Sequence, residues 1–266
     1  MKGVSLKLEK ICSGYGNKRI IEDIDLDINA GEIISVCGPN GTGKSTLFKT
    51  ISGFLKPISG NVIIDGKNIK SHTLKEMAAI MAVVKQFLTP ATITVFDYVS
   101  MGRYPYFKPL QFFRSKNDLD KTEEYINLTG ISQLTEKELD EISGGERQLA
   151  QIAKALCQEP GLMLLDEPVS SLDISHQIQI MDILRKLNRK FGMTILIVLH
   201  DLNLAAEYSD RVVLMNNGKI RIFDTAENVF KYDIIEEVYK TPVIVKESPL
   251  SKKPYVIPVP EDYCKG

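Results

Sequence analysis

Cysteine is scarce in this chain of 266 residues, and its four copies are scattered. They stand at positions 12, 37, 157 and 264, and no two of them form the Cys-x-x-Cys pair typical of zinc sites and redox motifs. The wide spacing also argues against a disulfide framework. We therefore expect reduced thiols in a protein of the cytoplasmic compartment.

Two further absences narrow the class of protein. Charge of one sign is not in excess, since 33 Lys and Arg stand against 34 Asp and Glu, whereas nucleic-acid-binding domains usually carry a basic surplus. Apolar runs such as Ile195–Leu199 fall far short of the roughly 18 to 20 residues of a membrane span, and the opening residues lack the apolar core of a signal peptide. We expect a globular chain that binds no nucleic acid and crosses no membrane by itself, although it can dock on a protein that does.

Strand and helix patterns alternate along most of the chain, after an opening of alternating apolar and polar residues that predicts β-structure. The predicted strands and helices that follow cover residues 32–38, 44–54, 60–65, 81–85, 161–168, 174–191, 194–200 and 202–208. This alternation predicts an α/β fold with a mostly parallel sheet covered by helices. Asn217-Gly218 predicts a tight hairpin turn, and the proline-rich tail from 241 predicts loosely structured β-segments.

The middle of the chain differs in character. Between about 87 and 160 helical patterns dominate, interrupted by an aromatic segment at residues 103–113. We expect one domain over residues 1–240 with a helical subdomain inserted at about 87–160. A short C-terminal extension then covers residues 241–266.

A glycine-rich loop follows the apolar strand at 32–38 and precedes a helical pattern. It reads Gly-Pro-Asn-Gly-Thr-Gly-Lys-Ser and matches the P-loop, GxxxxGK[ST], in its proper context of strand, loop and helix. Glycines let successive backbone N–H groups point inward at phosphate oxygens, and the helix N-terminus favours anions. We expect Lys44 to contact the β- and γ-phosphates and Ser45 to hold Mg²⁺. The predicted nucleotide-binding residues here are Gly38, Pro39, Asn40, Gly41, Thr42, Gly43, Lys44, Ser45 and Thr46.

Two carboxylates end a second apolar strand. Asp166 and Glu167 follow the four apolar residues 162–165, and ligands of open α/β sheets bind at the carboxyl ends of the strands. Asp166 is placed to hold the Mg²⁺ shell, and Glu167 to orient or deprotonate the attacking water. By itself, such a pair more often caps the next segment, but the P-loop favours the catalytic interpretation.

A third motif separates this chain from other P-loop proteins. Residues 143–148 read Ser-Gly-Gly-Glu-Arg-Gln at a helix start and resemble the signature sequence of the ATP-binding-cassette (ABC) family. The resemblance covers essentially residues 1 to 240, and Ile142 is its one departure, where the family usually has Leu. The family's other motifs fall in order at Tyr15, Gln86, Asp166–Pro168, Ser170–Asp173 and His200.

The resemblance implies a P-loop NTPase of the ABC ATPase fold, with an antiparallel β-subdomain and an inserted helical subdomain. It implies that Tyr15 stacks on adenine, that Gln86 reaches Mg²⁺ and the attacking water, and that His200 contacts the γ-phosphate. It also implies a head-to-tail dimer in which two ATPs are sandwiched between two copies of the chain. The signature residues that would meet the partner's ATP are Ser143, Gly144, Gly145 and Glu146, with Asp173 at the same interface.

Several kinds of ABC protein remain open. The stretch between Gln86 and Ser143 lacks the sustained heptads of the DNA-repair type, and the single cassette differs from the translation type. The iron–sulfur assembly type is harder to exclude. A GTPase is disfavoured because no NKxD motif occurs. The favoured interpretation is the ATPase subunit of a transporter, peripheral on the cytoplasmic face of the membrane and bound to integral permease subunits.

The segment Thr94–Phe107 resembles ATPases that serve iron-siderophore, haem and cobalamin importers, which act with an external substrate-binding protein. Molybdate or tungstate import is the alternative. The aromatic segment Arg103–Phe113 has two interpretations: it is the core of the helical subdomain, or part of it lines the groove that receives the permease.

Overall fold

The computed structural model describes residues 2–86, 91–108, 110–260 and 262. At its centre lies a six-stranded sheet with the strand order β10-β9-β3-β8-β7-β6, in which β10 alone runs antiparallel to its neighbour. This is the mostly parallel sheet that the sequence predicts. The strands are β3 (Ile33–Cys37), β6 (Met81–Val84), β7 (Leu162–Asp166), β8 (Thr194–Val198), β9 (Arg211–Asn216) and β10 (Lys219–Asp224).

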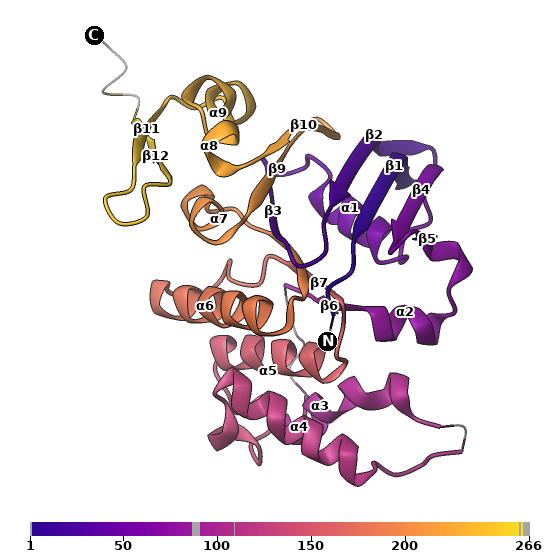
Figure 1. The fold of residues 1–266 in the computed structure, drawn as a ribbon. Helices are drawn as coiled ribbons and strands as arrows, with labels where there is room; N and C mark the ends of the chain where they lie inside the picture. The colour runs from indigo at the N-terminus through magenta and orange to yellow at the C-terminus, as the bar shows by residue number, and fades with distance from the viewer. Residues whose placement is uncertain (1, 87–90, 109, 261, 263–266) are drawn as a thin grey trace.

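A separate antiparallel sheet has the order β2-β1-β4-β5 and lies at the upper right in Figure 1. It forms the expected antiparallel β-subdomain together with α1. Its elements are β1 (Leu6–Tyr15), β2 (Lys18–Ile28), β4 (Ser59–Ile64), β5 (Lys67–Asn68), η1 (Ile69–Ser71) and α1 (Lys44–Ile51).

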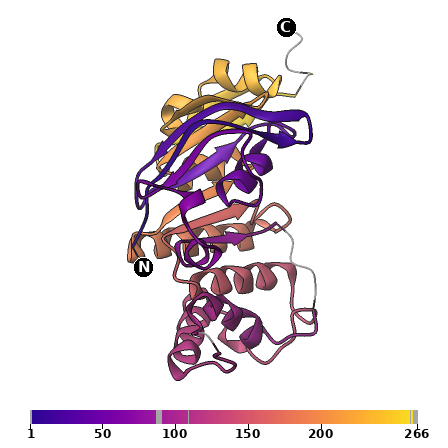
Figure 2. The same ribbon diagram turned by 90° about the vertical axis from the view of Figure 1, so that its right-hand side faces the viewer.

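The lower part of the molecule is helical, as both ribbon views show (Figures 1 and 2). No regular strand occurs there among the residues that the structure describes. Its elements are α3 (Val95–Ser100), η2 (Met101–Tyr106), α4 (Lys116–Thr129), η3 (Ser132–Leu134) and α5 (Gly144–Cys157), with α2 (Leu74–Ile80) nearby. The remaining elements follow β7, β8 and β10: α6 (Ile174–Phe191), α7 (Leu202–Tyr208), α8 (Ala226–Val229), α9 (Tyr232–Tyr239), β11 (Val243–Glu247) and β12 (Pro254–Pro258).

Two hydrophobic cores cover the two faces of the central sheet. In β3, Ile34 and Val36 pack with α1 and the antiparallel sheet, whereas Ile33 and Cys37 pack with the helical side. Every residue of β3 and β8 is buried for this reason. Burial on both faces also explains why these strands read as continuous apolar runs and not as alternating patterns.

Three local predictions can be compared with the structure. Asn217 and Gly218 both have positive φ, 45° and 76°, and form the predicted tight turn between β9 and β10. The helix predicted from Lys44 ends at Ile51, so extending it to Phe54 was wrong: Phe54 lies beyond a turn and is 73% exposed. The tail from 241 is more regular than predicted, because β11 and β12 pair over five residues each.

The described helices are all too short or too polar to cross a membrane.

Candidate functional site

The P-loop joins β3 to α1, and two of its glycines are required by the backbone. Gly38 has φ 146°, and a Cβ there would lie 2.4 Å from the Met215 carbonyl oxygen. Gly43 has φ 99°, and a Cβ there would lie 2.4 Å from the Ile21 side chain. Any larger residue would push the loop out of position, so glycine at these two sites sets the curvature of the phosphate cradle.

Lys44 is the buried cation of this loop. Its Nζ donates to the carbonyl oxygens of Gly38 at 2.7 Å and Pro39 at 3.0 Å. Burial lowers the pKa of the Lys44 ammonium, while the carboxylates of Glu167 and Asp166 oppose that shift. Ser45, the next residue, is exposed in the first turn of α1.

Asp166 ends β7 with one unsatisfied oxygen. Its Oδ1 is buried and has no hydrogen-bond partner among the described residues. Burial raises the pKa of this carboxyl, and the charge of Glu167 adds to the effect. A buried carboxylate oxygen without a donor is suited to a hard cation, and α1, which carries Ser45, packs against β7. The residues present therefore fit Mg²⁺.

Glu167 is the point at which three separate segments meet. Gln86 follows β6, Glu167 follows β7 and His200 follows β8, and these strands are parallel neighbours whose carboxyl ends share one edge. The Gln86 amide Nε2 lies 2.8 Å from Glu167 Oε2, and His200 Nε2 lies 2.6 Å from Oε1. The sequence predictions for these three residues thus fall on one constellation. Glu167 itself has φ 51°, a conformation that non-glycine residues rarely adopt.

Tyr15 lies at the end of β1 with half of its surface exposed. Lys49 of α1 contacts it twice: its Nζ lies 5.6 Å from the ring centroid and 3.3 Å from the hydroxyl. An exposed aromatic ring beside the phosphate-binding helix is compatible with stacking on a base.

A cavity of about 540 Å³ opens next to these residues. It is lined by Phe48, Lys49, Ser52, Phe54, Val83, Lys85, Gln86 and Asp166. Gln86 and Asp166 lie at the carboxyl ends of β6 and β7, so the cavity opens onto that edge of the sheet.

Ser143 begins α5 with a capping box. Its Oγ accepts from the Glu146 backbone N–H at 3.3 Å, and its own N–H donates to the Glu146 carboxylate at 2.8 Å. Ser143 and Gly144 are exposed, and a Cβ on Gly144 would meet nothing within 4 Å. In this structure the Glu146 side chain stabilises the helix start. The exposed hydroxyl and the first N–H groups of α5 are the parts able to receive an anion.

His176 is a residue that the sequence analysis missed, because no motif in the sequence assigns it a role. Asp173 caps α6 through the His176 backbone N–H, and its carboxylate also lies 2.8 Å from His176 Nδ1. The imidazole packs on Gly145, where a Cβ would lie 2.8 Å from His176 Cδ2. His176 therefore links the predicted interface residue Asp173 to the signature helix.

Comparison with known proteins agrees with this geometry. The family model described as ABC transporter matches residues 21–170. The ferric enterobactin transport ATP-binding protein FepC of Escherichia coli is 38% identical over 255 residues, which are 96% of this chain and 94% of that protein. The chain belongs to the ABC transporter family. It is an ATP-binding subunit that hydrolyses ATP.

Solved structures share the fold of this ABC subunit. A chain from a metal-chelate type ABC transporter in an inward-facing conformation matches with a TM-score of 0.85 and 24% identity, over 98% of this chain and 100% of that chain. A bacterial ABC transporter cassette solved as a dimer matches with a TM-score of 0.71 and 26% identity, over 83% of this chain and 98% of that one.

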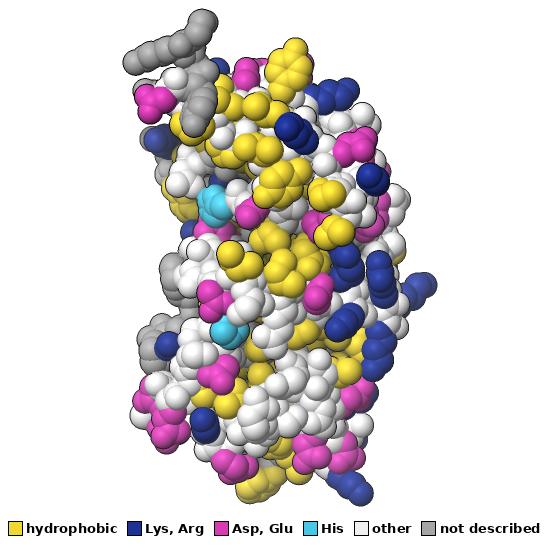
Figure 3. Space-filling model, turned by 90° about the vertical axis from the view of Figure 1, so that its left-hand side faces the viewer, with side chains coloured by type: hydrophobic (Ala, Val, Ile, Leu, Met, Phe, Trp, Pro, Cys, Tyr) yellow, Lys and Arg dark blue, Asp and Glu magenta, His cyan; other side chains and the backbone are white. Residues whose placement is uncertain are grey.

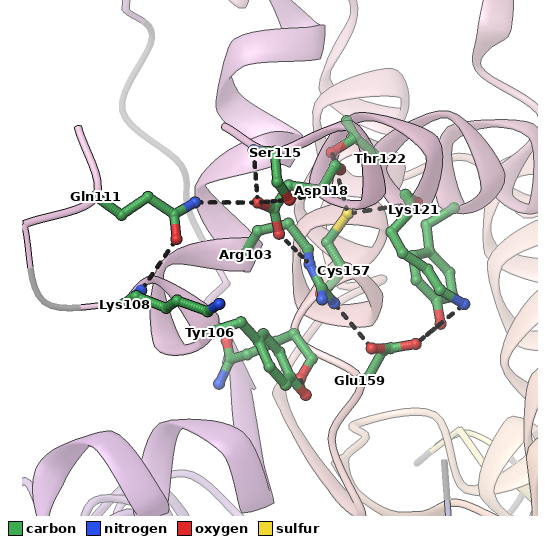
Figure 4. A network of polar contacts seen from close by, with 12 residues as sticks. Arg103, Tyr106, Lys108, Gln111, Ser115, Asp118, Lys121, Thr122, Cys157 and Glu159 are labelled. Atoms are coloured by element: carbon green, nitrogen blue, oxygen red, sulfur yellow. Dashed lines mark hydrogen bonds and ion pairs between the residues drawn. The ribbon is translucent and has the colours of Figure 1, made fainter. Parts of the chain in front are cut away.

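The aromatic segment of the ABC subunit is partly buried and partly exposed. Arg103 is only 3% exposed and belongs to the core of the helical part (Figure 4). Its guanidinium lies 2.9 Å from Glu159 and 3.3 Å from Asp118, and it stacks on the Tyr106 ring at 4.0 Å. Other aromatic rings of this segment are exposed, namely Tyr104, Phe112 and Phe113.

Proposed function

We propose that this chain is the ATPase subunit of an importer that takes up a ferric siderophore or a related metal chelate. The observation that carries the proposal is the convergence of Gln86, Glu167 and His200 at the strand edge that also bears the P-loop. The choice of cargo is supported by the FepC relative, whose name gives ferric enterobactin transport. Haem and cobalamin are further cargoes of this proposed class, because the segment Thr94–Phe107 resembles ATPases that serve importers of all three.

In the proposed mechanism, ATP lies along α1 and the P-loop. Tyr15 stacks on the adenine, and residues 38–46 surround the phosphates. Lys44 contacts the β- and γ-phosphates. Ser45, Asp166 and Gln86 would hold Mg²⁺, which supplies positive charge to the phosphate oxygens when it is bound.

Glu167 orients the attacking water and accepts its proton, while His200 contacts the γ-phosphate. Gln86 and His200 each hold one carboxylate oxygen of Glu167, so the base is fixed in direction before substrate enters. The exposed N-terminus of α5 supplies a second anion-binding surface.

That second surface acts on a partner's ATP. None of the hydrogen bonds or ion pairs within the described part of the chain joins residues 143–146 to the P-loop. Two copies arranged head to tail would bring the Ser143 of each against the ATP of the other, with Asp173 at the contact. The dimeric cassette of the same fold supports this arrangement.

The permease subunits dock beside the exposed rings of the aromatic segment and the cavity of about 540 Å³. Exposed aromatic side chains are typical of interface centres. The ATPase would then lie on the cytoplasmic face of the membrane, and the external binding protein would act through the permease.

The test is to purify the chain with the permease encoded nearest to it and to measure ATP hydrolysis by the complex. The cognate binding protein is then added, loaded with a ferric siderophore, haem, cobalamin or molybdate. We expect a ferric chelate to change the rate. A response to molybdate alone would reassign the cargo, and failure to associate with any permease would remove the transport role.

A further inference from the structure

The C-terminal hairpin β11–β12 is joined to the helix that follows His200. Asn203, in the first turn of α7, bonds the backbone of Val256 in β12 in both directions. Its Oδ1 accepts from the Val256 N–H at 2.7 Å, and its Nδ2 donates to the Val256 carbonyl oxygen at 3.2 Å. The Asn203 amide thus accepts from and donates to the backbone of the same residue, as a neighbouring strand would. These two hydrogen bonds hold the hairpin against α7, so we treat the two elements as one unit.

The same hairpin also holds the far end of α7. Lys253 Nζ donates to the backbone carbonyl oxygens of Glu207 at 3.0 Å and Ser209 at 3.4 Å. These carbonyls belong to the last turn of α7 and to the residue after it. The hairpin therefore contacts α7 at both ends, and Figure 1 shows the two elements next to each other at the upper left.

His200 depends on α7 for its position. The chain leaves β8 with the Leu199 N–H bonded to the Val36 carbonyl oxygen, and α7 begins only two residues after His200. Asp201 caps that helix through the N–H groups of Asn203 and Leu204, at 2.7 and 3.1 Å. The His200 imidazole is 40% exposed, and its one partner in the described part of the chain is Glu167. Its direction is thus set by the backbone between β8 and α7.

Packing and polar contacts together hold α7 against the hairpin, since the buried side chains of Leu204 and Val256 belong to the same hydrophobic core. A cavity of about 380 Å³ separates the loop at His200 from α9 and the hairpin, with Ile235, Tyr239 and Val243 on its far wall. Beside this cavity, the two hydrogen bonds between Asn203 and Val256 add a directed polar connection close to His200.

We infer that the C-terminal hairpin is a positioning element of the active site and that Asn203 is a positioning residue for His200. The inference rests on the proposed contact of His200 with the γ-phosphate. It assigns a role in ATP hydrolysis to residues 243–258, which the sequence marks only as an extension beyond the ATPase domain.

The test is a double-mutant cycle on the full chain. Asn203→Ala removes both bonds to Val256, and we expect kcat for ATP hydrolysis to fall about tenfold, because small displacements of a catalytic group have large effects on rate. The KM for ATP should change less than about twofold, because the P-loop is untouched. In a His200→Ala background, measured by single-turnover hydrolysis, Asn203→Ala should have almost no further effect.

Two further variants separate positioning from folding. Asn203→Asp keeps the acceptor for the Val256 N–H but loses the donor, so its kcat should lie between those of Asn203→Ala and the wild type. Glu236→Ala removes the bond from the Val243 N–H at 2.9 Å, which ties the hairpin to α9 and not to α7. This control should leave kcat near the wild-type value.

An equal loss of kcat from Asn203→Ala in both backgrounds would overturn the inference while leaving the role of His200 intact. A wild-type kcat for Asn203→Ala would also overturn the inference. The same holds if the KM for ATP rises by the same factor by which kcat falls. A wild-type kcat for His200→Ala itself would show instead that the proposed function misassigns His200, and the inference would then lose its basis.

Discussion

At the scale of single residues, the proposed catalytic groups are held in place by contacts within the protein itself. Glu167 has a positive φ that costs about 1–3 kcal/mol, and it keeps that conformation between Gln86 and His200. Asp166, next to it, keeps a buried oxygen without a donor. Strain and an unsatisfied polar atom in adjacent residues mark the place where substrate interactions complete the structure.

His176 offers a prediction at this scale. His176→Ala removes the side chain that lies between Asp173 and Gly145, so the start of α5 loses its support. We expect kcat per dimer to fall several-fold and the affinity of each monomer for ATP to stay unchanged, because the P-loop lies elsewhere. Steady-state hydrolysis and equilibrium nucleotide binding measure the two quantities.

His72→Ala is the matched control, since His72 has no part in the site. A normal kcat in His176→Ala would contradict the link between Asp173 and the signature helix.

How far the sequence predicts the site depends on how local each signal is. The P-loop and the Asp166–Glu167 pair were predictable from strand, loop and helix patterns, and Gln86 and His200 only from the family resemblance. His176 was not predictable, because its role depends on a contact between two helix starts that are far apart in sequence. The hydrogen bonds between Asn203 and Val256 were not predictable either, since they depend on how β12 is placed against α7.

At the scale of elements, one buried network holds the helical part together. Figure 4 shows Arg103 of η2 between Asp118 of α4 and Glu159, which follows α5. Glu159 also lies 3.2 Å from Lys121 and accepts from the Tyr125 hydroxyl at 3.0 Å. A single arginine therefore connects η2, α4 and Glu159 beyond the end of α5.

We expect Arg103→Met to lower the free energy of unfolding by about 3–5 kcal/mol, because Asp118 and Glu159 both lose their arginine partner and the Asp118 carboxylate stays buried. Urea unfolding of the full chain measures the change. Arg221→Met is the control: Arg221 forms an exposed bidentate pair with Glu237, and the loss of this pair should change the free energy of unfolding far less. Equal effects of the two variants would contradict the structural role of Arg103.

The difference in the free energy of unfolding between the wild type and Arg103→Met should depend on pH, and the sign of this dependence follows from the pKa of Glu159. Burial acts to raise the pKa of Glu159, but the Arg103 and Lys121 bonds outweigh it and hold the pKa below its ordinary value of 4.5. A carboxyl with a lowered pKa stabilises the fold above its unfolded pKa and loses that contribution as pH falls through its folded pKa. The gap between wild type and Arg103→Met should therefore be constant near pH 7 and shrink as pH falls below about 4.5.

Sequence patterns predicted the strands of the central sheet better than they predicted where the helix after the P-loop ends. The strands of the central sheet were predictable because burial on both faces leaves continuous apolar runs. The helix from Lys44 was extended to Phe54 because an apolar residue continued its period, but Phe54 is exposed and lines the cavity near Gln86. An apolar residue that faces a cavity cannot be told from a core residue by spacing alone.

At the scale of the whole molecule, exposed apolar side chains lie at two opposite ends. The helical end presents Tyr104, Phe112 and Phe113, whereas the opposite end carries the C-terminal hairpin. On the side shown in Figure 3, hydrophobic side chains gather towards that hairpin end. The hairpin residues Ile244, Tyr255 and Ile257 are among the exposed apolar ones.

The double variant Tyr104→Ala, Phe112→Ala should weaken association with the permease at least tenfold, because exposed aromatic residues dominate interface energies. ATP hydrolysis by the isolated chain should not change, since neither residue belongs to the nucleotide site. Co-purification with the permease measures the association. Leu250→Ala, which removes an exposed apolar residue at the opposite end, is the control. Unchanged association of the double variant would place the docking surface elsewhere.

The central claim is that Glu167 serves hydrolysis within an ATP sandwich made by two copies of the chain. Its most direct test is the mass of Glu167→Gln in solution with Mg-ATP, measured by light scattering, together with its rate of hydrolysis. We predict a dimer that retains ATP and a kcat lowered by about 10²–10⁴-fold, since the general base is lost but the phosphate site is intact. A monomer that hydrolyses ATP at the wild-type rate would contradict the account.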